Sequence, residues 1–270
     1  MNINFSKLTA AGNDFILIDN RENIIQEKNY QCLAKKLCNR KYSIGGDGLI
    51  FLERSAFKDF KMKYFNSDGS HASMCGNGGR SVAKFACDLG VTGSKMVFET
   101  DAGVISAEIL PKNRVRLDLY DPKNLKQNIK IDVSGKKFDA DFIDTGVPHV
   151  VIFVGNVEKM DVFKYGREIR YHKTFMPDGT NVNFVEVAKN NTLFVRTYER
   201  GVEGETLACG TGITASGIIS VLKGFRKSPV SIVARGGDKL SVSFKNLNNK
   251  VSNVILEGHV LIAFKGVVEI

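Results

Sequence analysis

The sequence predicts an α/β fold of the α+β type, built as two pseudo-symmetric domains that are each a curled, mostly antiparallel sheet around a central helix. Three observations predict this fold: the length of 270 residues, an internal repeat, and one long helical segment within each repeat. Because a domain typically has about 150 residues, the length favours two modest domains. A content of 43% hydrophobic and 25% charged residues is typical of a globular chain that buries a core.

The internal repeat is clearest in two short segments, Cys75-Gly76-Asn77-Gly78 and Cys209-Gly210-Thr211-Gly212, which lie 134 residues apart. The same offset aligns Gly12 with Gly146 and is expected to continue without a gap as far as Gly103 and its counterpart. A single offset over such a length indicates two homologous halves.

Short strands are expected throughout both halves, because hydrophobic runs of four to eight residues alternate with turn residues. In the first half they lie at residues 4–8, 15–19, 49–54, 61–65, 96–100, 104–109 and 115–120. In the second half they lie at residues 137–143, 150–154, 182–188, 193–198, 230–234, 240–244 and 254–256. Since the tail at 251–256 matches 115–119 in pattern, the domains are expected at residues 1–117 and 118–258.

One long helix is expected after each Cys-Gly pair, at residues 78–89 and 212–223. The first has one apolar face and ends at Gly90, as amphipathic helices commonly do. The second has no charged residue before Lys223. Because a helix that is apolar on every side must be enclosed, we expect the sheet to curl around it.

Composition and charge exclude several classes of function. The formal net charge is +9, but there is no run of five basic residues and no nucleic-acid-binding motif, so no nucleic-acid partner is expected. The longest uncharged apolar stretch, residues 210–222, is too short to span a bilayer, so no membrane partner is expected.

The first residues lack a signal-peptide pattern, which favours a cytoplasmic location. Five cysteines without a Cys-x-x-Cys pair argue against a disulfide framework and against a structural metal site.

Cys75 and Cys209 each stand immediately before an expected helix, where unpaired backbone N–H groups and the helix dipole favour a thiolate. The same N–H groups, unshielded at Gly76 and Gly210, suit a carboxylate. If the two halves face each other, both thiols reach one carbon from opposite sides. One thiolate then removes the Cα proton while the opposite thiol delivers another, and the N–H groups stabilise the enolate charge.

A single cysteine before a helix is more often a core residue than a catalytic one. Two that are related by a repeat, each followed by Gly-x-Gly, favour catalysis instead. The glycine-rich turns lack the endings and the spacing of nucleotide-binding loops. Cys32, Cys38 and Cys87 lack flanking glycines and are expected to fill the core.

Several distinctive segments follow one another in order along the chain. They are Ala11-Gly12-Asn13-Asp14-Phe15, Asn66-Ser67-Asp68-Gly69, residues 74–80, Pro148-His149, Glu199-Arg200-Gly201 and residues 205–212. Together they resemble the diaminopimelate epimerase family, and the resemblance covers essentially the whole chain. The resemblance implies an isomerase that interconverts LL- and meso-diaminopimelate in lysine and peptidoglycan precursor synthesis, with no cofactor and no metal. It also implies the fold of that family, with a final strand at about 259–270 returning to the first domain, and a homodimer.

Carried over residue by residue, the resemblance makes Cys75 and Cys209 the acid–base pair. It makes His149 and Glu199 the residues that poise the two thiols, since a histidine or carboxylate beside a thiol can accept or relay its proton. The positions that the resemblance assigns to substrate binding are Asn13, Asn66, Gly76, Asn77, Asn181, Glu199, Arg200, Gly210 and Thr211. Chemically, a distal carboxylate suits the guanidinium of Arg200, and an ammonium group suits amide oxygens.

Other interpretations remain open for several of these residues: a surface salt bridge for Arg200, a strand position for His149, and turn formation for Asn13 and Asn66. Two rival functions also remain. One is a proline or hydroxyproline racemase, which typically has His where this chain has Asn77. The other is a non-catalytic module that binds an amino acid, for which two thiols would not be needed.

The chain departs from the family pattern at two places. Val147 stands where many members have Asn before Pro-His, so a contact to the distal part of the substrate is absent or comes from elsewhere. The segment 202–205 is one residue longer than the common form, which should alter the loop before Cys209.

Overall fold

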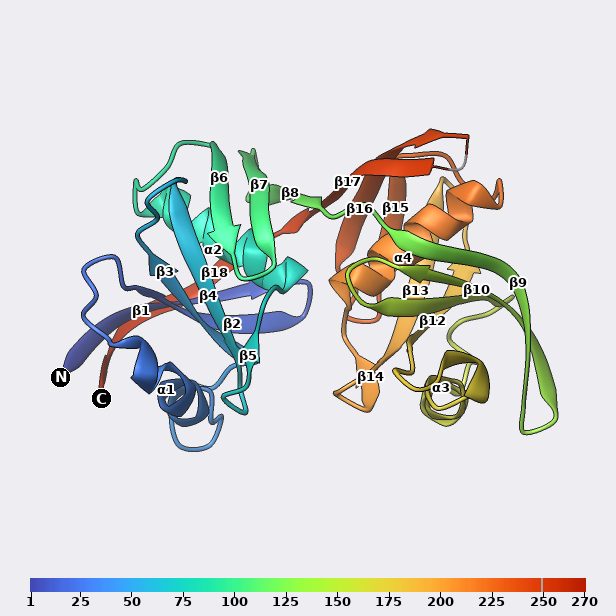
Figure 1. Ribbon diagram of the computed structural model, residues 1–270, viewed down its shortest axis with the longest axis horizontal. Helices are drawn as coiled ribbons and strands as arrows, with labels where there is room; N and C mark the ends of the chain where they lie inside the picture. The colour runs from blue at the N-terminus through green and yellow to red at the C-terminus, as the bar shows by residue number, and fades with distance from the viewer. Residues whose placement is uncertain (249) are drawn as a thin grey trace. The chain divides into compact units, whose positions relative to one another are not determined.

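The computed structural model describes residues 1–248 and 250–270, and the chain divides into two compact units (Figure 1). Unit 1 comprises residues 1–118 and 257–270, and unit 2 comprises residues 119–256. The first domain was expected to end at residue 117, and unit 1 ends at residue 118. The chain was expected to return to the first domain at about residue 259, and it returns at residue 257. Within the described residues, no helix is long and apolar enough to cross a membrane.

Unit 1 is a mixed sheet with one long helix, α2, against it (Figure 1). Its elements are β1 (Asn2–Ala10), β2 (Asn13–Asp19), α1 (Tyr30–Leu37), β3 (Gly48–Glu53), β4 (Phe60–Asn66), β5 (His71–Ala72), α2 (Gly76–Asp88), β6 (Lys95–Thr100), β7 (Gly103–Leu110), β8 (Arg114–Leu119) and β18 (Leu261–Glu269). Paired strands follow in the order β18, β1, β2, β3, β4, β6, β7, β8, with β2–β3 and β4–β6 parallel and the other pairs antiparallel. Because α2 contacts β1 and β7, far apart in this order, the sheet curls around the helix.

Unit 2 repeats this plan around α4. Its elements are β9 (Lys123–Val133), β10 (Lys136–Asp144), β11 (Pro148–Phe153), α3 (Val162–Arg170), β12 (Asn181–Val187), β13 (Thr192–Glu199), β14 (Gly204–Thr206), α4 (Gly210–Leu222), β15 (Val230–Ala234), β16 (Lys239–Leu247) and β17 (Lys250–His259). Paired strands follow in the order β9, β10, β11, β12, β13, β15, β16, with β11–β12 and β13–β15 parallel. α4 contacts strands from β10 to β16, and its residues 212–220 are all buried, so the expected enclosure of this helix is observed.

Each unit also has a second helix, α1 or α3, which packs on the sheet away from the long helix. On β3, Leu49 and Phe51 join the core that includes α1. The intervening Ile50 lies within reach of the start of α2, where a Cβ added to Gly78 would meet it at 3.2 Å. A strand covered on both faces is apolar without alternation, which explains the continuous run from Leu49 to Leu52.

The repeat is visible in the backbone as well as in the sequence. α2 and α4 both have 13 residues, and their first residues, Gly76 and Gly210, differ by the offset. Glycine pairs related by the same offset have positive φ in both halves, where only glycine is unstrained. These pairs are Gly12 and Gly146, Gly90 and Gly224, and Gly103 and Gly237.

The expectation that the offset runs without a gap was wrong. Ile50 pairs with Tyr64 across β3 and β4, so a constant offset would pair Phe184 with Tyr198. Tyr198 instead pairs with Val182. The cause is a shorter hairpin connection in unit 2, which has residues 188–191 where unit 1 has residues 54–59.

Candidate active site

Cys75 is the N-cap residue of α2, which begins two residues earlier than expected and therefore directly after the cysteine. Its backbone is extended, and its Sγ accepts a hydrogen bond from the main-chain nitrogen of Gly78 at 3.5 Å. The thiol therefore lies among the N–H groups that the first turn of a helix leaves unpaired. That is the environment in which a cysteine favours its thiolate form.

Asn13 and Asn77 are brought together beside this helix start. Asn77, which is buried, donates from Nδ2 to Asn13 Oδ1 at 2.6 Å, and Arg80 donates to Asn77 Oδ1 at 2.6 Å. Asn13 in turn donates from its own Nδ2 to Asp47 Oδ2 at 3.0 Å. The amides of Asn13 and Asn77, both predicted to bind substrate, are thus held in fixed orientations by each other and by charged groups.

Asp47 belongs to a charged cluster that the sequence did not reveal. Arg40 contacts both Asp14 and Asp47, at 2.5 and 2.9 Å, and Lys7 contacts Asp14 at 2.9 Å. Burial alone would raise the pKa of Asp14, but the hydrogen bonds and charges of Arg40 and Lys7 outweigh it and lower that pKa. The Asp14 carboxylate is therefore ionised at neutral pH. Arg40 joins Asp14 to Asp47, and Asp47 holds Asn13.

Asn66, at the end of β4, has partners for both ends of its amide. Its Oδ1 accepts from the Tyr64 hydroxyl at 2.9 Å, and its Nδ2 donates to Ser70 Oγ at 2.9 Å. The main-chain nitrogen of Gly69 donates to the Asn66 carbonyl, which closes a turn. These contacts are those expected of a turn-forming asparagine.

Cys209 is the N-cap residue of α4, in the position that corresponds to Cys75. Its Sγ lies 3.4 Å from the hydroxyl of Thr211, and that hydroxyl lies 2.9 Å from Nε2 of His149. Thr145 donates to the Thr211 carbonyl at 3.0 Å and so helps to fix this residue. The Thr211 hydroxyl therefore connects Cys209 to His149, and all three were predicted to be site residues.

His149 lies on β11 and is fully buried. Burial lowers the pKa of its imidazole to about 3, and the positive charge of Arg200 contributes in the same direction. The ring is therefore neutral at pH 7. A neutral imidazole donates through one nitrogen and accepts through the other.

Asn181 holds the start of β12 against the end of β13. Its Oδ1 accepts from the main-chain nitrogen of Arg200 at 2.8 Å, and its Nδ2 donates to the carbonyl of Pro148 at 2.8 Å. The Arg200 side chain donates to the carbonyl of Asp178 at 3.0 Å. Asn181 thus orients the segment that carries both Glu199 and Arg200.

The additional residue in the segment 202–205 is accommodated at Glu203. This residue has a positive φ of 55°, and its carboxylate accepts from Arg170 Nε at 3.2 Å and from the Tyr198 hydroxyl at 3.3 Å. Its main-chain nitrogen donates to the carbonyl of Glu199. The longer loop is therefore folded back on α3 and β13.

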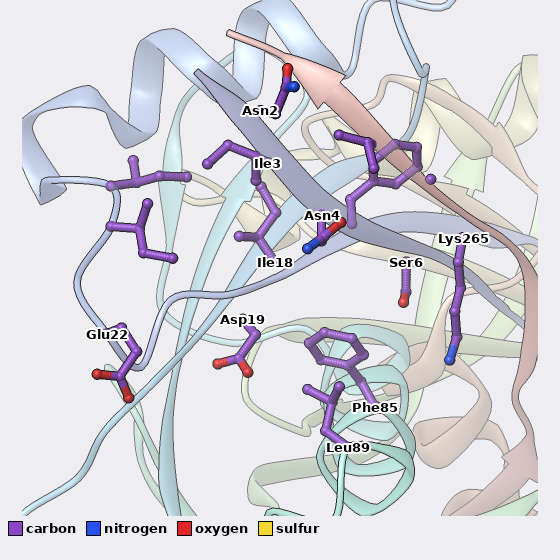
Figure 2. A pocket seen from close by; sticks show the side chains of 15 residues that line it. Asn2, Ile3, Asn4, Ser6, Ile18, Asp19, Glu22, Phe85, Leu89 and Lys265 are labelled. Atoms are coloured by element: carbon purple, nitrogen blue, oxygen red, sulfur yellow. The ribbon is translucent and has the colours of Figure 1, made fainter.

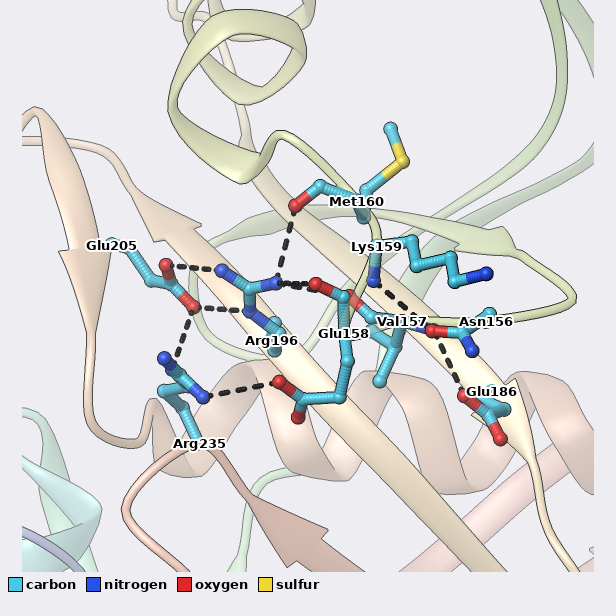
Figure 3. Close-up of polar contacts among 9 residues, drawn as sticks. All are labelled: Asn156, Val157, Glu158, Lys159, Met160, Glu186, Arg196, Glu205 and Arg235. Carbon is cyan, nitrogen blue, oxygen red and sulfur yellow. Dashed lines mark hydrogen bonds and ion pairs between the residues drawn. The ribbon is translucent and has the colours of Figure 1, made fainter.

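The strand before Cys209 is held by the ion-paired cluster shown in Figure 3. Arg196 donates from Nε and from a terminal nitrogen to the two carboxylate oxygens of Glu205, at 2.6 and 2.7 Å. The other terminal nitrogen of Arg196 donates to the carbonyls of Val157 and Met160. This planar, two-pronged contact fixes β14, which leads to the cysteine.

Asn183 is a site residue that the sequence analysis missed. It lies on β12, is fully buried, and places Nδ2 at 3.2 Å from Nδ1 of His149. A Cβ added to Gly212 would lie 2.3 Å from Asn183 Oδ1, so glycine at this position of α4 leaves room for the amide. The available signal was a polar residue between two apolar ones, Val182 and Phe184, on a strand.

The expectation that three cysteines fill the core was right only for Cys38, which is buried, whereas Cys87 is half-buried. Cys32 is exposed, because the residues that α1 buries, Tyr30 and Leu33 among them, lie on its other face. Burial raises the pKa of Cys38 to about 12, so this thiol is protonated at neutral pH.

A pocket of about 620 Å³ in unit 1 is separate from these groups (Figure 2). Phe85, in the last turn of α2, and Leu89, its C-cap residue, line the pocket at the end of the helix away from Cys75. Asp19 and Lys265 are among its charged residues. None of the predicted site residues lines this pocket.

Solved structures with the same fold share little sequence identity with this chain. A Bacillus anthracis protein described as a phenazine biosynthesis protein of the PhzF family covers 100% of both chains, with a TM-score of 0.75 and 16% identity. A probable proline racemase from Agrobacterium radiobacter has a TM-score of 0.72 and 14% identity, over 99% of this chain and 92% of the other. At such identities these likenesses concern the fold alone, and they confirm the expected fold class.

Sequence relatives are much more similar. The profile of the family described as diaminopimelate epimerase matches twice, at residues 5–123 and 142–260, once for each half. A diaminopimelate epimerase from Aquifex aeolicus is 44% identical over 97% of this chain and 96% of its own length. One from Hydrogenobaculum is 43% identical over the same shares. The resemblance expected from the sequence is confirmed, and the chain belongs to the diaminopimelate epimerase family.

Proposed function

We propose that this chain epimerises LL-diaminopimelate to meso-diaminopimelate by a two-base exchange of the Cα proton, with Cys75 and Cys209 as the acid–base pair. The observation that supports this most strongly is that each unit has a cysteine as the N-cap of its long helix. In both cases the helix starts with Gly-x-Gly, so backbone N–H groups are accessible around the thiol.

The proposed steps balance without any further reactant. One thiolate takes the Cα proton and becomes a thiol, and the released electron pair moves into the α-carboxylate to form an enolate. The N–H groups at the starts of α2 and α4, around Gly76 and Gly210, stabilise that charge. The opposite thiol then gives its proton to the other face of the carbon and becomes a thiolate.

Recognition of the distal end of the substrate is assigned to Arg200, Glu199, Asn181 and the amides of Asn13 and Asn66. Asn77 and Thr211 are assigned, with Gly76 and Gly210, to the α-carboxylate. A guanidinium binds a carboxylate with two parallel hydrogen bonds, which suits a long, doubly charged zwitterion. Because Asn181 uses both ends of its amide on Arg200 and Pro148, the contacts support a role in placing Arg200.

We also assign the protein to the cytoplasm and to a homodimer, as the family resemblance implies. On β18, the apolar side chains of Leu261, Phe264 and Val267 are 52%, 49% and 62% exposed, which supports a contact of this strand with a second copy. Sedimentation equilibrium of the wild-type protein is expected to give twice the chain mass. A single chain mass at micromolar concentration would contradict the dimer.

A substrate comparison tests the proposed activity. Reduced, purified protein is expected to convert LL-diaminopimelate to the meso isomer, measured by chiral chromatography, and to leave L-proline and trans-4-hydroxy-L-proline unchanged. Turnover of proline without turnover of diaminopimelate would assign the chain to the racemase alternative. Binding of diaminopimelate by calorimetry without turnover would instead favour the non-catalytic module.

A further inference from the structure

We propose that Asn183 is a positioning residue for Cys209. Its side-chain amide fixes which ring nitrogen of His149 carries the proton, and the ring, through Thr211, then directs a hydrogen-bond donor at Cys209 Sγ. This role rests on the proposed function, because a donor at sulfur matters only if Cys209 must become a thiolate.

The orientation of the Asn183 amide is determined by its neighbours on both flanking strands. Nδ2 lies 2.9 Å from the main-chain oxygen of Val150, which can only accept a hydrogen bond. The atom that faces this oxygen must therefore be the amide nitrogen. On the other side, Thr197, which stands opposite Asn183 in the ladder, donates to Oδ1 at 2.9 Å. One orientation satisfies both contacts.

The orientation of the amide decides the tautomer of His149. The second hydrogen of Nδ2 faces Nδ1 of the ring at 3.2 Å. Because an amide NH₂ only donates, Nδ1 must be the unprotonated nitrogen, and the proton of the neutral ring is on Nε2. Burial keeps the ring neutral.

The tautomer decides what Thr211 can do. Nε2–H donates to the Thr211 hydroxyl oxygen at 2.9 Å, and the single hydrogen of that hydroxyl is then left to donate to Cys209 Sγ at 3.4 Å. In the opposite tautomer, Nε2 would accept this hydrogen and take it away from the sulfur. Since a hydrogen bond to the charged form favours that form, the observed arrangement stabilises a thiolate.

The test combines a spectroscopic signature with kinetics. Asn183→Leu removes the amide donor without adding charge, and Asn183→Ala serves if leucine does not fit. The ¹⁵N signals of the labelled His149 ring are expected to show the Nε2–H tautomer in the wild type and an added Nδ1–H population in the variant. We expect kcat to fall by about 10- to 100-fold, the effect typical of losing a histidine's outer partner, and KM to change less.

Thr197→Val is the matched control, because it removes the donor to Oδ1 and leaves both Nδ2 contacts in place. It is expected to retain the Nε2–H tautomer and a kcat near that of the wild type. The role is overturned if Asn183→Leu retains the wild-type tautomer, if the tautomer changes while kcat does not, or if Thr197→Val shifts the ring equally. The tautomer is measured without substrate, so its result does not depend on turnover. A wild type that fails to epimerise diaminopimelate contradicts the proposed function, and the ring signals still test whether Asn183 sets the tautomer of His149.

Discussion

Replacing either Cys75 or Cys209 by alanine is expected to lower kcat/KM for diaminopimelate epimerisation by about 10²- to 10⁴-fold, the contribution typical of a general acid or base. Each inversion needs one group to remove the Cα proton and another to supply a proton on the opposite face. Alanine at either position leaves one face without such a group. The rates are measured in both directions with purified, reduced variants.

Two controls separate this effect from loss of folding. Cys32→Ala removes an exposed thiol of unit 1 and is expected to leave kcat/KM unchanged. The double variant, lacking both Cys75 and Cys209, is expected to be little worse than either single variant, because groups that act as a unit are not additive. Either single variant with near wild-type turnover, and with an unaltered melting temperature, would refute the acid–base assignment.

Acidification below about pH 6.5 is expected to destabilise the protein through His149, by about 2 kcal/mol between pH 6.5 and pH 4.5. The buried ring has its pKa lowered to about 3 from an ordinary value of 6.5. Between these values the unfolded chain binds a proton at His149 that the folded chain does not, so stability falls as pH falls. Above pH 6.5 both states have a neutral ring, and the contribution is fully present.

The measurement is the free energy of urea unfolding of wild type and His149→Gln as a function of pH. Other acidic and basic groups contribute to both curves, so the difference between them isolates His149. The wild-type curve is expected to be steeper by up to about 1.4 kcal/mol per pH unit, which corresponds to one proton. Parallel curves would mean that His149 titrates in the folded protein as it does in the unfolded chain.

The long helices and their cysteines could be predicted because their signals are local. Gly-x-Gly follows each cysteine, and a glycine, Gly90 or Gly224, stands just after each helix. The helix α1 could have been predicted in the same way, since its buried residues Tyr30, Leu33, Ala34 and Leu37 have helical spacing. Its length of eight residues gives only about two turns, which makes the helical pattern weak.

The groups that the sequence did not reveal depend on contacts between distant segments. Asp47 is placed against Asn13 by the parallel pairing of β2 and β3, which no local pattern specifies. Asn183 faces His149 through the parallel pairing of β11 and β12 in the same way. The repeat could not reveal Asn183 either, because the constant offset places Leu49 at that position of the first half.

The most direct test of the two-base account is the fate of hydrogen isotopes when the wild-type protein acts on LL-diaminopimelate in D₂O. The reaction is stopped at low conversion, and product and remaining substrate are separated and analysed by mass spectrometry. Because the thiol that delivers the proton has exchanged with solvent, the account predicts deuterium at the inverted Cα of the meso product and hydrogen at Cα of the remaining LL substrate. A meso product that retains hydrogen at the inverted carbon would contradict it, because the proton would then have been removed and returned by a single base.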